Sequence, residues 1–270
     1  RYCYLDPRLG AKLAVAECCR NLSTVGALPV AATNNLNFGN PERPEIMAQL
    51  VEAIEGIAEA CAFFETPITG GNVSLYNETL GQPIYPTPVL GIVGLMETHA
   101  PVPMGFPAAG LEVAVLGGLG EADELRFGSS QYAKEVLREL WGLPPALDME
   151  FEKRVQAAVR EAVTAGAVAS AHDLGDGGLA FALAECTIAA GVGAEIALDS
   201  DLRPELLLFH EGPSRVIITA KDLSAVSVIA EKHGVPLLRI GATAGDTLSI
   251  SNRAEVLVRA SATQLSEPWE

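Results

Sequence analysis

A run of periodic apolar residues between positions 44 and 64 constrains the fold of this chain more than any other feature. Pro44 suits the first turn of a helix, and the apolar positions that follow repeat at spacings of three and four. They are Ile46, Leu50, Ile54, Ile57, Ala58, Cys61 and Phe64. Short strand-like runs at 28–32 and 66–68 flank this predicted helix. The order strand, helix, strand predicts a βαβ-like unit, in which the segments after the two strands converge into a ligand crevice.

Polar residues and glycines follow both predicted strands. The asparagine-rich segment 33–40 follows the first strand, and we predict a loop there. The second strand leads into a strand-and-loop that ends with Gly70, Gly71, Asn72, Val73 and Ser74. Glycines let the backbone approach a ligand closely, and Asn72 and Ser74 face the same side if the segment is extended. An amide oxygen and a hydroxyl in this arrangement suit a metal ion and a phosphate of a nucleotide.

The same residues have a simpler interpretation. Asparagine tolerates left-handed backbone conformations and caps helices, and Gly-Gly-Asn is common in ordinary turns. From the residues alone, both interpretations of the segments 33–40 and 70–74 stay open.

Composition excludes several classes of function. The formal net charge of −16 argues against nucleic-acid binding, because a phosphate backbone requires a basic protein face. The five cysteines are odd in number and contain no Cys-x-x-Cys, which predicts reduced thiols in a cytoplasmic protein rather than a disulfide framework. No apolar run reaches the roughly 18 residues of a membrane span, so no membrane association is expected.

Helices and strands alternate along the rest of the chain, which predicts an α/β or α+β fold in two domains. Further helices are predicted over 6–25, 129–141 and 149–165, from the glycines at 175–178 to near residue 191, and over 223–233. Further strands are predicted over 89–96 (buried), 111–116, 168–171, 194–198, 215–220, 237–242, 247–250 and 256–258. Pro101, Pro103 and Pro107 indicate a linker, so we expect one domain at 1–105 and another at 106–270.

A second glycine-rich segment, residues 172–178, precedes one of these helices. Glycines before a helix can bind an anion through backbone N–H groups, but Asp173 and Asp176 would repel it. We therefore favour Asp173 or Asp176 as a helix N-cap. His172 is a candidate general base, although a lone histidine is more often a structural residue. The chain contains neither a Walker A pattern nor a Gly-x-Gly-x-x-Gly fingerprint.

Long strings of this sequence resemble phosphoribosylformylglycinamidine synthase subunit II, and the resemblance covers essentially the whole chain. The most specific strings are Asn-Leu-Asn-Phe-Gly-Asn-Pro at 35–41, Gly-Gly-Asn-Val-Ser-Leu-Tyr-Asn at 70–77, Ile-Tyr-Pro-Thr-Pro-Val at 84–89 and Ser-Ala-His-Asp at 170–173. The chain resembles only the second, C-terminal half of that subunit and starts inside it.

The resemblance implies an ATP-dependent ligase of purine biosynthesis. Such an enzyme converts formylglycinamide ribonucleotide and ammonia, drawn from glutamine, into formylglycinamidine ribonucleotide. The implied fold is similar to aminoimidazole ribonucleotide synthetase, with an N-type barrel-forming domain and a C-type domain. The implied partners are a glutaminase subunit, a small accessory subunit and the N-terminal half of the same subunit. The isolated piece is expected to be inactive and to self-associate, with a homodimer as one form.

The resemblance also implies roles for four residues. Asn34 and Gly71 would bind ATP, Asn72 would bind Mg²⁺, and Ser74 would bind the substrate. No catalytic residue is implied in this half. The family more commonly has aspartate at the position of Asn34, so this chain lacks one anionic oxygen there. That loss favours an alternative function, a non-catalytic scaffold that binds a nucleotide without turning it over.

Overall fold

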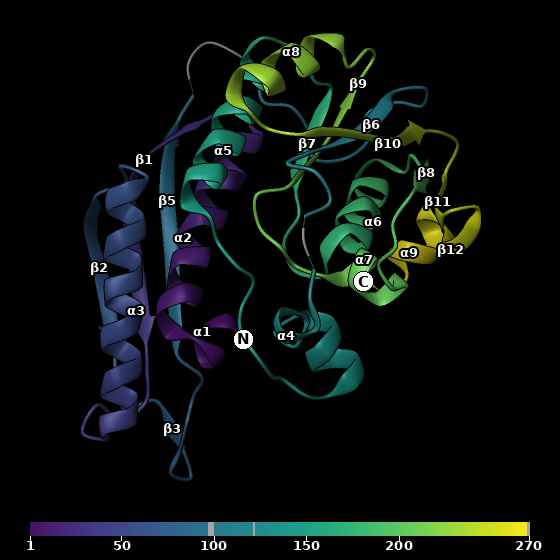
Figure 1. Ribbon diagram of the computed structural model, residues 1–270. Helices are drawn as coiled ribbons and strands as arrows, with labels where there is room; N and C mark the ends of the chain where they lie inside the picture. Colours follow the sequence, from purple (N-terminus) through teal and green to yellow (C-terminus); the bar gives the residue numbers. More distant parts are fainter. Residues whose placement is uncertain (97–99, 121, 269–270) are drawn as a thin grey trace.

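The chain builds two mixed α/β parts that pack against each other (Figure 1). The computed structural model describes residues 1–96, 100–120 and 122–268. The helices are α1 (Tyr2–Leu5), α2 (Pro7–Thr24), α3 (Pro44–Phe63), α4 (Glu124–Phe127), the π-helix η1 (Ala133–Leu137), α5 (Met149–Thr164), α6 (Gly178–Ala190), α7 (Pro204–Phe209), α8 (Ser224–His233) and α9 (Ala262–Ser266). None of them is both long enough and apolar enough to cross a membrane, within the part of the chain described.

The strands form two sheets and a small hairpin. They are β1 (Leu28–Asn37), β2 (Ile68–Ser74), β3 (Glu78–Thr79), β4 (Gln82–Pro83), β5 (Thr87–Leu95), β6 (Glu112–Leu116), β7 (Ser170–Asp173), β8 (Ala194–Leu198), β9 (Val216–Ala220), β10 (Leu237–Thr243), β11 (Thr247–Asn252) and β12 (Glu255–Ser261). The predicted domain boundary near residue 105 lies between β5 and β6.

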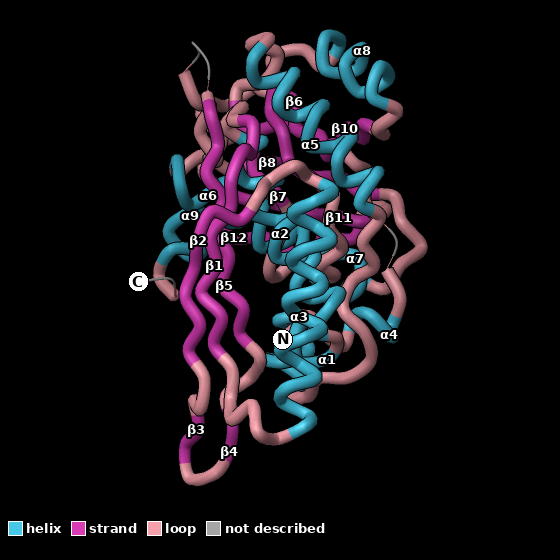
Figure 2. Tube along the Cα trace, turned by 90° about the vertical axis from the view of Figure 1, so that its left-hand side faces the viewer, coloured by secondary structure: helices cyan, strands magenta, loops and turns pink. Residues whose placement is uncertain are grey.

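The predicted βαβ unit is present in the N-terminal part. Strand β1 pairs in parallel with β2 and antiparallel with β5, and α3 connects β1 to β2. Helices α2 and α3 lie against one face of this three-stranded sheet (Figure 2). A shared core of apolar side chains from both helices and the sheet fills the space between them. We call the opposite face of the sheet the open face.

The expectation of a buried strand at 89–96 is wrong. In β5 every second residue is exposed, and Val89, Val93 and Leu95 are 50%, 61% and 64% exposed. Side chains alternate between the two faces of a strand, so one set packs on the helices and the other lies on the open face. When a strand is apolar on both faces, its sequence does not reveal which face is covered by other parts of the protein.

The C-terminal part has three layers. Its seven-stranded sheet has the order β12-β11-β8-β10-β6-β9-β7. Strand β6 contributes side chains to the cores on both faces of the sheet. Val113 and Val115 pack in the core beneath α6, and Ala114 and Leu116 pack in the core beneath α5 and α8. Both faces of β6 are therefore buried, in contrast to the sheet of the N-terminal part.

The prediction of a loop over 33–40 is also wrong for most of its length. Residues 33–37 continue strand β1, and residues 69–74 belong to β2. Strand β1 is the middle strand of its sheet, so its backbone groups find partners on both sides. This pairing outweighs the preference of asparagine for turns, which is a weak local tendency.

Two further predictions about the C-terminal part fail. Of the helix expected over 129–141, only a short helical stretch that includes η1 forms, and Arg138 ends it with a left-handed φ of 61°. Helix α6 is capped by Gly177, not by an aspartate, because Asp173 and Asp176 form ion pairs with arginines instead. The remaining predicted helices and strands occur at nearly their predicted bounds.

Candidate functional site

The first pair of predicted ligand-binding residues, Asn34 and Gly71, lies together in neighbouring strands. They are register partners in the parallel ladder of β1 and β2. A methyl group on Gly71 would lie 2.1 Å from Oδ1 of Asn34 and 2.8 Å from its backbone oxygen. Only glycine allows the Asn34 side chain to lie over this position. The side-chain amide of Asn34 forms no hydrogen bond with any described residue, so it is available to a ligand.

The second pair, Asn72 and Ser74, lies on the other face of the same strands. Ala32 and Leu36 point into the core beneath the helices, and Asn34 between them shares that face. Asn72 pairs with Asn35, which points to the open face. Nδ2 of Asn72 donates to Oδ1 of Asn35 over 3.1 Å. Asn72 therefore lies on the open face.

Ser74 shares the open face because it follows Asn72 by two residues in an extended strand. Its hydroxyl lies 3.2 Å from Oδ1 of Asn77 and 3.1 Å from Nδ2 of the same amide. The four predicted residues thus form two pairs on opposite faces of the sheet. Both pairs lie at the edge of the described sheet, where β2 is the outermost strand on its side.

The residues at this edge offer few ligands to a metal ion. Among the described residues, no group of three or more His, Cys, Asp or Glu side chains is placed to hold a metal. Oδ1 of Asn72 supplies one neutral oxygen. Mg²⁺ commonly keeps several water ligands and takes others from the phosphates of a nucleotide. The edge is therefore compatible with a magnesium ion only where a nucleotide and water bring most of the ligands, in which case Oδ1 of Asn72 would supply one.

A carboxylate of the protein itself occupies the glycine-rich turn before α6. The buried carboxylate of Glu211 accepts hydrogen bonds from the backbone N–H groups of Gly177 and Gln131, both over 2.8 Å. Arg1 forms an ion pair with the same carboxylate. Burial raises the pKa of Glu211, which these partners oppose. Glu211 therefore already occupies this helix N-terminus. Sequence reasoning missed this role, because 34 positions separate Glu211 from Gly177.

His172 has a partner, but it lies away from the β1–β2 edge. Its Nε2 is 2.9 Å from a carboxylate oxygen of Glu185, a residue of α6. The structure therefore supplies an orienting carboxylate that the sequence did not reveal. His172 stands on β7, in the C-terminal part, and its contacts give it no connection with Asn72.

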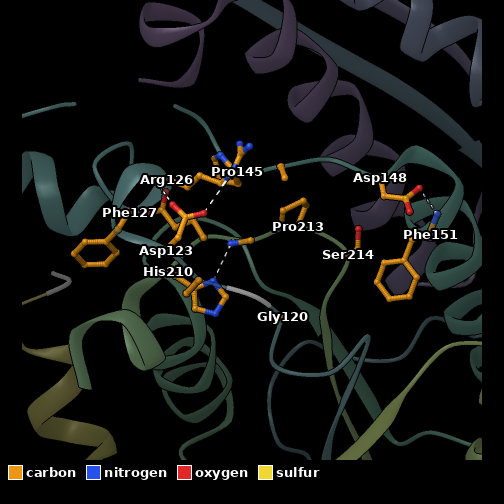
Figure 3. Close-up of a pocket in the computed structure, with 14 residues that line it drawn as sticks. Gly120, Asp123, Arg126, Phe127, Pro145, Asp148, Phe151, His210, Pro213 and Ser214 are labelled. Atoms are coloured by element: carbon orange, nitrogen blue, oxygen red, sulfur yellow. Dashed lines mark hydrogen bonds and ion pairs between the residues drawn. The ribbon is translucent and has the colours of Figure 1, made fainter. Parts of the chain in front are cut away.

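A cavity of about 440 Å³ lies between loops of the C-terminal part (Figure 3). Its polar side chains are engaged with the protein itself. Arg126 donates to the backbone oxygen of Pro144 over 2.6 Å, and Nδ1 of His210 accepts from the N–H of Gly212. Burial and the neighbouring Arg215 lower the pKa of His210 to about 3, so its ring stays neutral. No residue of β1 or β2 lines this cavity.

A buried ionic cluster joins the two parts of the chain. Arg20 of α2 pairs with Glu152 of α5 over 2.9 Å and with Asp173 of β7 over 3.3 Å. Gln156 and Ser214 donate further hydrogen bonds to the Glu152 carboxylate. Burial alone would lower the pKa of Arg20, but Glu152 and Asp173 raise it overall. The cluster fixes α2, and with it the N-terminal sheet, against the C-terminal part.

Comparisons with known proteins agree with this architecture. Residues 1–96 match the model of the AIR synthase related protein N-terminal domain, and residues 108–250 match that of the C-terminal domain. Phosphoribosylformylglycinamidine synthase subunit PurL of Moorella thermoacetica is 45% identical over 272 residues, which cover 100% of this chain and 37% of the relative. PurL of Thermomicrobium roseum is 46% identical over 276 residues, covering 100% and 36%. The chain thus spans little more than a third of these relatives.

Solved structures of Thermotoga maritima PurL share the fold. The complex with FGAR has a TM-score of 0.78 at 22% identity, over 97% of this chain and 44% of that one. The complex with ATP has a TM-score of 0.75 at 21% identity, over 97% and 42%. The PurLQS assembly has a TM-score of 0.72 at 22% identity, over 96% and 42%. The predicted synthetase-like fold, an N-type and a C-type domain, is confirmed, and the chain belongs to the family of AIR synthase related proteins.

Proposed function

We propose that this chain is the C-terminal half of a PurL-type subunit and takes part in the ATP-dependent amidation of formylglycinamide ribonucleotide. The observation that carries the proposal is the β1–β2 edge, where the Asn34 amide lies over Gly71 and the Asn72 amide, bonded through Nδ2 to Asn35, keeps its oxygen without a partner among the described residues. The similarity to PurL over the whole chain supports the same reaction.

Each of the four residues has a proposed role at this edge. The Asn34 amide bonds to the nucleotide, and Gly71 contributes to the ATP site by leaving room for that amide. Oδ1 of Asn72 holds Mg²⁺, and the hydroxyl of Ser74 binds the ribonucleotide substrate. ATP, when bound, supplies the phosphoryl group that converts the formamide oxygen into a leaving group, which ammonia then displaces.

A scaffold role is the second candidate, and one observation favours it. Position 34 carries a neutral amide, and no cluster of acidic residues lies near it in the described chain. Phosphoryl transfer needs Mg²⁺ held at the phosphates, and a site without carboxylate ligands holds that ion poorly. In this alternative, the edge binds a nucleotide that stabilises the protein and is never hydrolysed.

The remaining parts of the proposal concern partners and location. We propose that the open face meets the N-terminal half of the same subunit, and that the isolated chain covers it with a second copy. The glutaminase and small accessory subunits are proposed partners of the complete subunit, supported by the similarity to the PurLQS structure. We also propose a cytoplasmic location, and a domain boundary near residue 105.

Replacing Asn72 with alanine in the complete protein separates the two candidates. If the edge is catalytic, turnover falls while thermal stability changes little. If the edge is a scaffold, turnover is unchanged and the stabilisation by ATP or ADP is lost. Calorimetric titration of the chain with ATP and ADP in the presence of Mg²⁺, with the same variant as control, shows whether this half binds nucleotide by itself.

A further inference from the structure

We propose that Asn35 is a positioning residue, which holds the amide of Asn72 so that its oxygen faces the ligand. The inference rests on the proposed role of Asn72 as a metal ligand. Asn35 and Asn72 are register partners on the open face, and Nδ2 of Asn72 donates to Oδ1 of Asn35 over 3.1 Å.

This hydrogen bond selects one orientation of the Asn72 amide. An amide carries its donor and its acceptor at opposite ends of one plane, and a half-turn exchanges them. With Nδ2 committed to Asn35, Oδ1 of Asn72 has no partner among the described residues and points away from Asn35. A half-turn of the Asn72 amide alone would bring the two amide oxygens together and break the bond. With its own Oδ1 facing Asn72, Asn35 leaves the metal-binding oxygen of Asn72 free and makes the non-binding nitrogen face the protein.

The backbone of Asn35 is paired on both sides, whereas that of Asn72 is paired in the described sheet on one side. It lies in the middle strand β1, paired with β2 on one side and β5 on the other. The side chain of Asn37 donates to the backbone oxygen of Asn35 over 3.0 Å and to that of Thr87 over 3.4 Å, which ties β1 to β5 at this point. Asn72 lies exposed in the outer strand β2. A proposed metal ligand on an edge strand is thus oriented by a residue on the middle strand of the sheet.

Two substitutions at this position separate the hydrogen bond from the bulk of the side chain. Asn35→Asp keeps an acceptor for Nδ2 of Asn72, whereas Asn35→Leu has similar volume and no acceptor. Thr33→Val is the matched control. It lies two residues earlier on the same face of β1, and it removes a comparable bond to β2, that of the Thr33 hydroxyl to the backbone oxygen of Gly70 at 3.0 Å.

The first readout is the affinity of Mn²⁺ for the complete protein. It is measured by titration in the presence of ATP, followed by electron paramagnetic resonance. We expect Asn35→Leu to weaken it by roughly 10- to 100-fold, the usual effect of losing a residue that orients a metal ligand. Asn35→Asp and Thr33→Val keep at least the wild-type affinity. The second readout is the side-chain amide signal of Asn72 in ¹⁵N spectra, whose slowed solvent exchange is lost only in Asn35→Leu.

The variant Asn72→Ala makes the possible failures distinguishable. If it weakens Mn²⁺ binding while Asn35→Leu does not, the positioning role is overturned and the metal role of Asn72 stands. If Asn72→Ala leaves Mn²⁺ binding unchanged, or the complete protein binds no Mn²⁺ with ATP, both are overturned. Equal losses of Mn²⁺ affinity in Asn35→Asp and Asn35→Leu also overturn the positioning role, because only the leucine variant removes the acceptor.

Discussion

The guanidinium of Arg20 lies 2.9 Å from the carboxylate of Glu152, and only 3% and 0% of these side chains are exposed. Arg20 belongs to α2 and Glu152 to α5, so this buried pair crosses from one part of the chain to the other. Because α2 lies against the sheet that carries the candidate site, the pair determines where that site stands relative to the C-terminal part.

Glu152→Ala is expected to lower the free energy of unfolding by about 3–5 kcal/mol, because it leaves the buried charge of Arg20 with fewer partners. Equilibrium unfolding in urea measures the loss. Asp201→Ala is the control, since Asp201 pairs with Arg253 at the surface, where both side chains are more than half exposed. Surface pairs contribute little. Equal losses of unfolding free energy in Glu152→Ala and Asp201→Ala would contradict the role given to the buried pair.

Gly71→Ala is expected to weaken ATP binding. The added methyl group meets Oδ1 of Asn34 at 2.1 Å, so the Asn34 side chain has to move away from the position proposed to face the nucleotide. A clash of this kind costs about 1–3 kcal/mol, which corresponds to roughly 5- to 150-fold in affinity.

Gly70→Ala is the matched control, because a methyl group there meets no atom within 4 Å. Titration calorimetry on the two variants and the wild type gives the comparison. Similar ATP affinities in Gly71→Ala and Gly70→Ala would show that the contact between Asn34 and Gly71 does not shape the nucleotide site.

The fold was predictable where local pattern and final structure agree. The apolar spacing of α3 and the strand-like runs around it predicted the βαβ unit. The strings around Asn34 and Asn72 identified the family. The assignment of residues 33–37 to a loop failed because strand pairing, which depends on residues 37 or more positions away, outweighs the local preference of asparagine.

The arrangement within the candidate site was less predictable. Which face each residue occupies follows from strand register, and a shift of one residue would exchange the faces. The bond between Asn35 and Asn72 depends on that register as well. The partners of Arg20 lie 132 and 153 positions away in the sequence, so no local pattern reveals them.

Val93→Lys is expected to reduce self-association of the isolated chain. Val93 lies on the open face, is 61% exposed, and has the exposed Val89 and Leu95 beside it on the same strand. A charge placed there opposes burial of this face against a second copy. Val228→Lys in α8 is the control, because Val228 is 67% exposed and lies in the C-terminal part. Light scattering measures the mass, and a wild-type monomer at every concentration contradicts the proposed association.

Glu17→Gln is expected to stabilise the protein at pH 8 and to change little at pH 5. Burial raises the pKa of Glu17 from 4.5 to about 7, and the nearby carboxylates of Asp173, Asp176 and Glu211 add to the rise while Arg20 opposes it. The folded state therefore binds a proton at Glu17 that the unfolded state has released once the pH exceeds 4.5. Between pH 4.5 and 7 this group makes folding less favourable as the pH rises, and above 7 the penalty is complete.

Glutamine resembles the protonated carboxyl group and cannot ionise, so it removes the penalty at high pH. The difference in unfolding free energy between variant and wild type should grow from near zero at pH 5 to at most about 3 kcal/mol at pH 8. Urea unfolding at several pH values measures this difference, and Glu255→Gln, at an exposed carboxylate, is the control. A difference that stays constant from pH 5 to pH 8 would show that Glu17 ionises as readily in the folded chain as in the unfolded one.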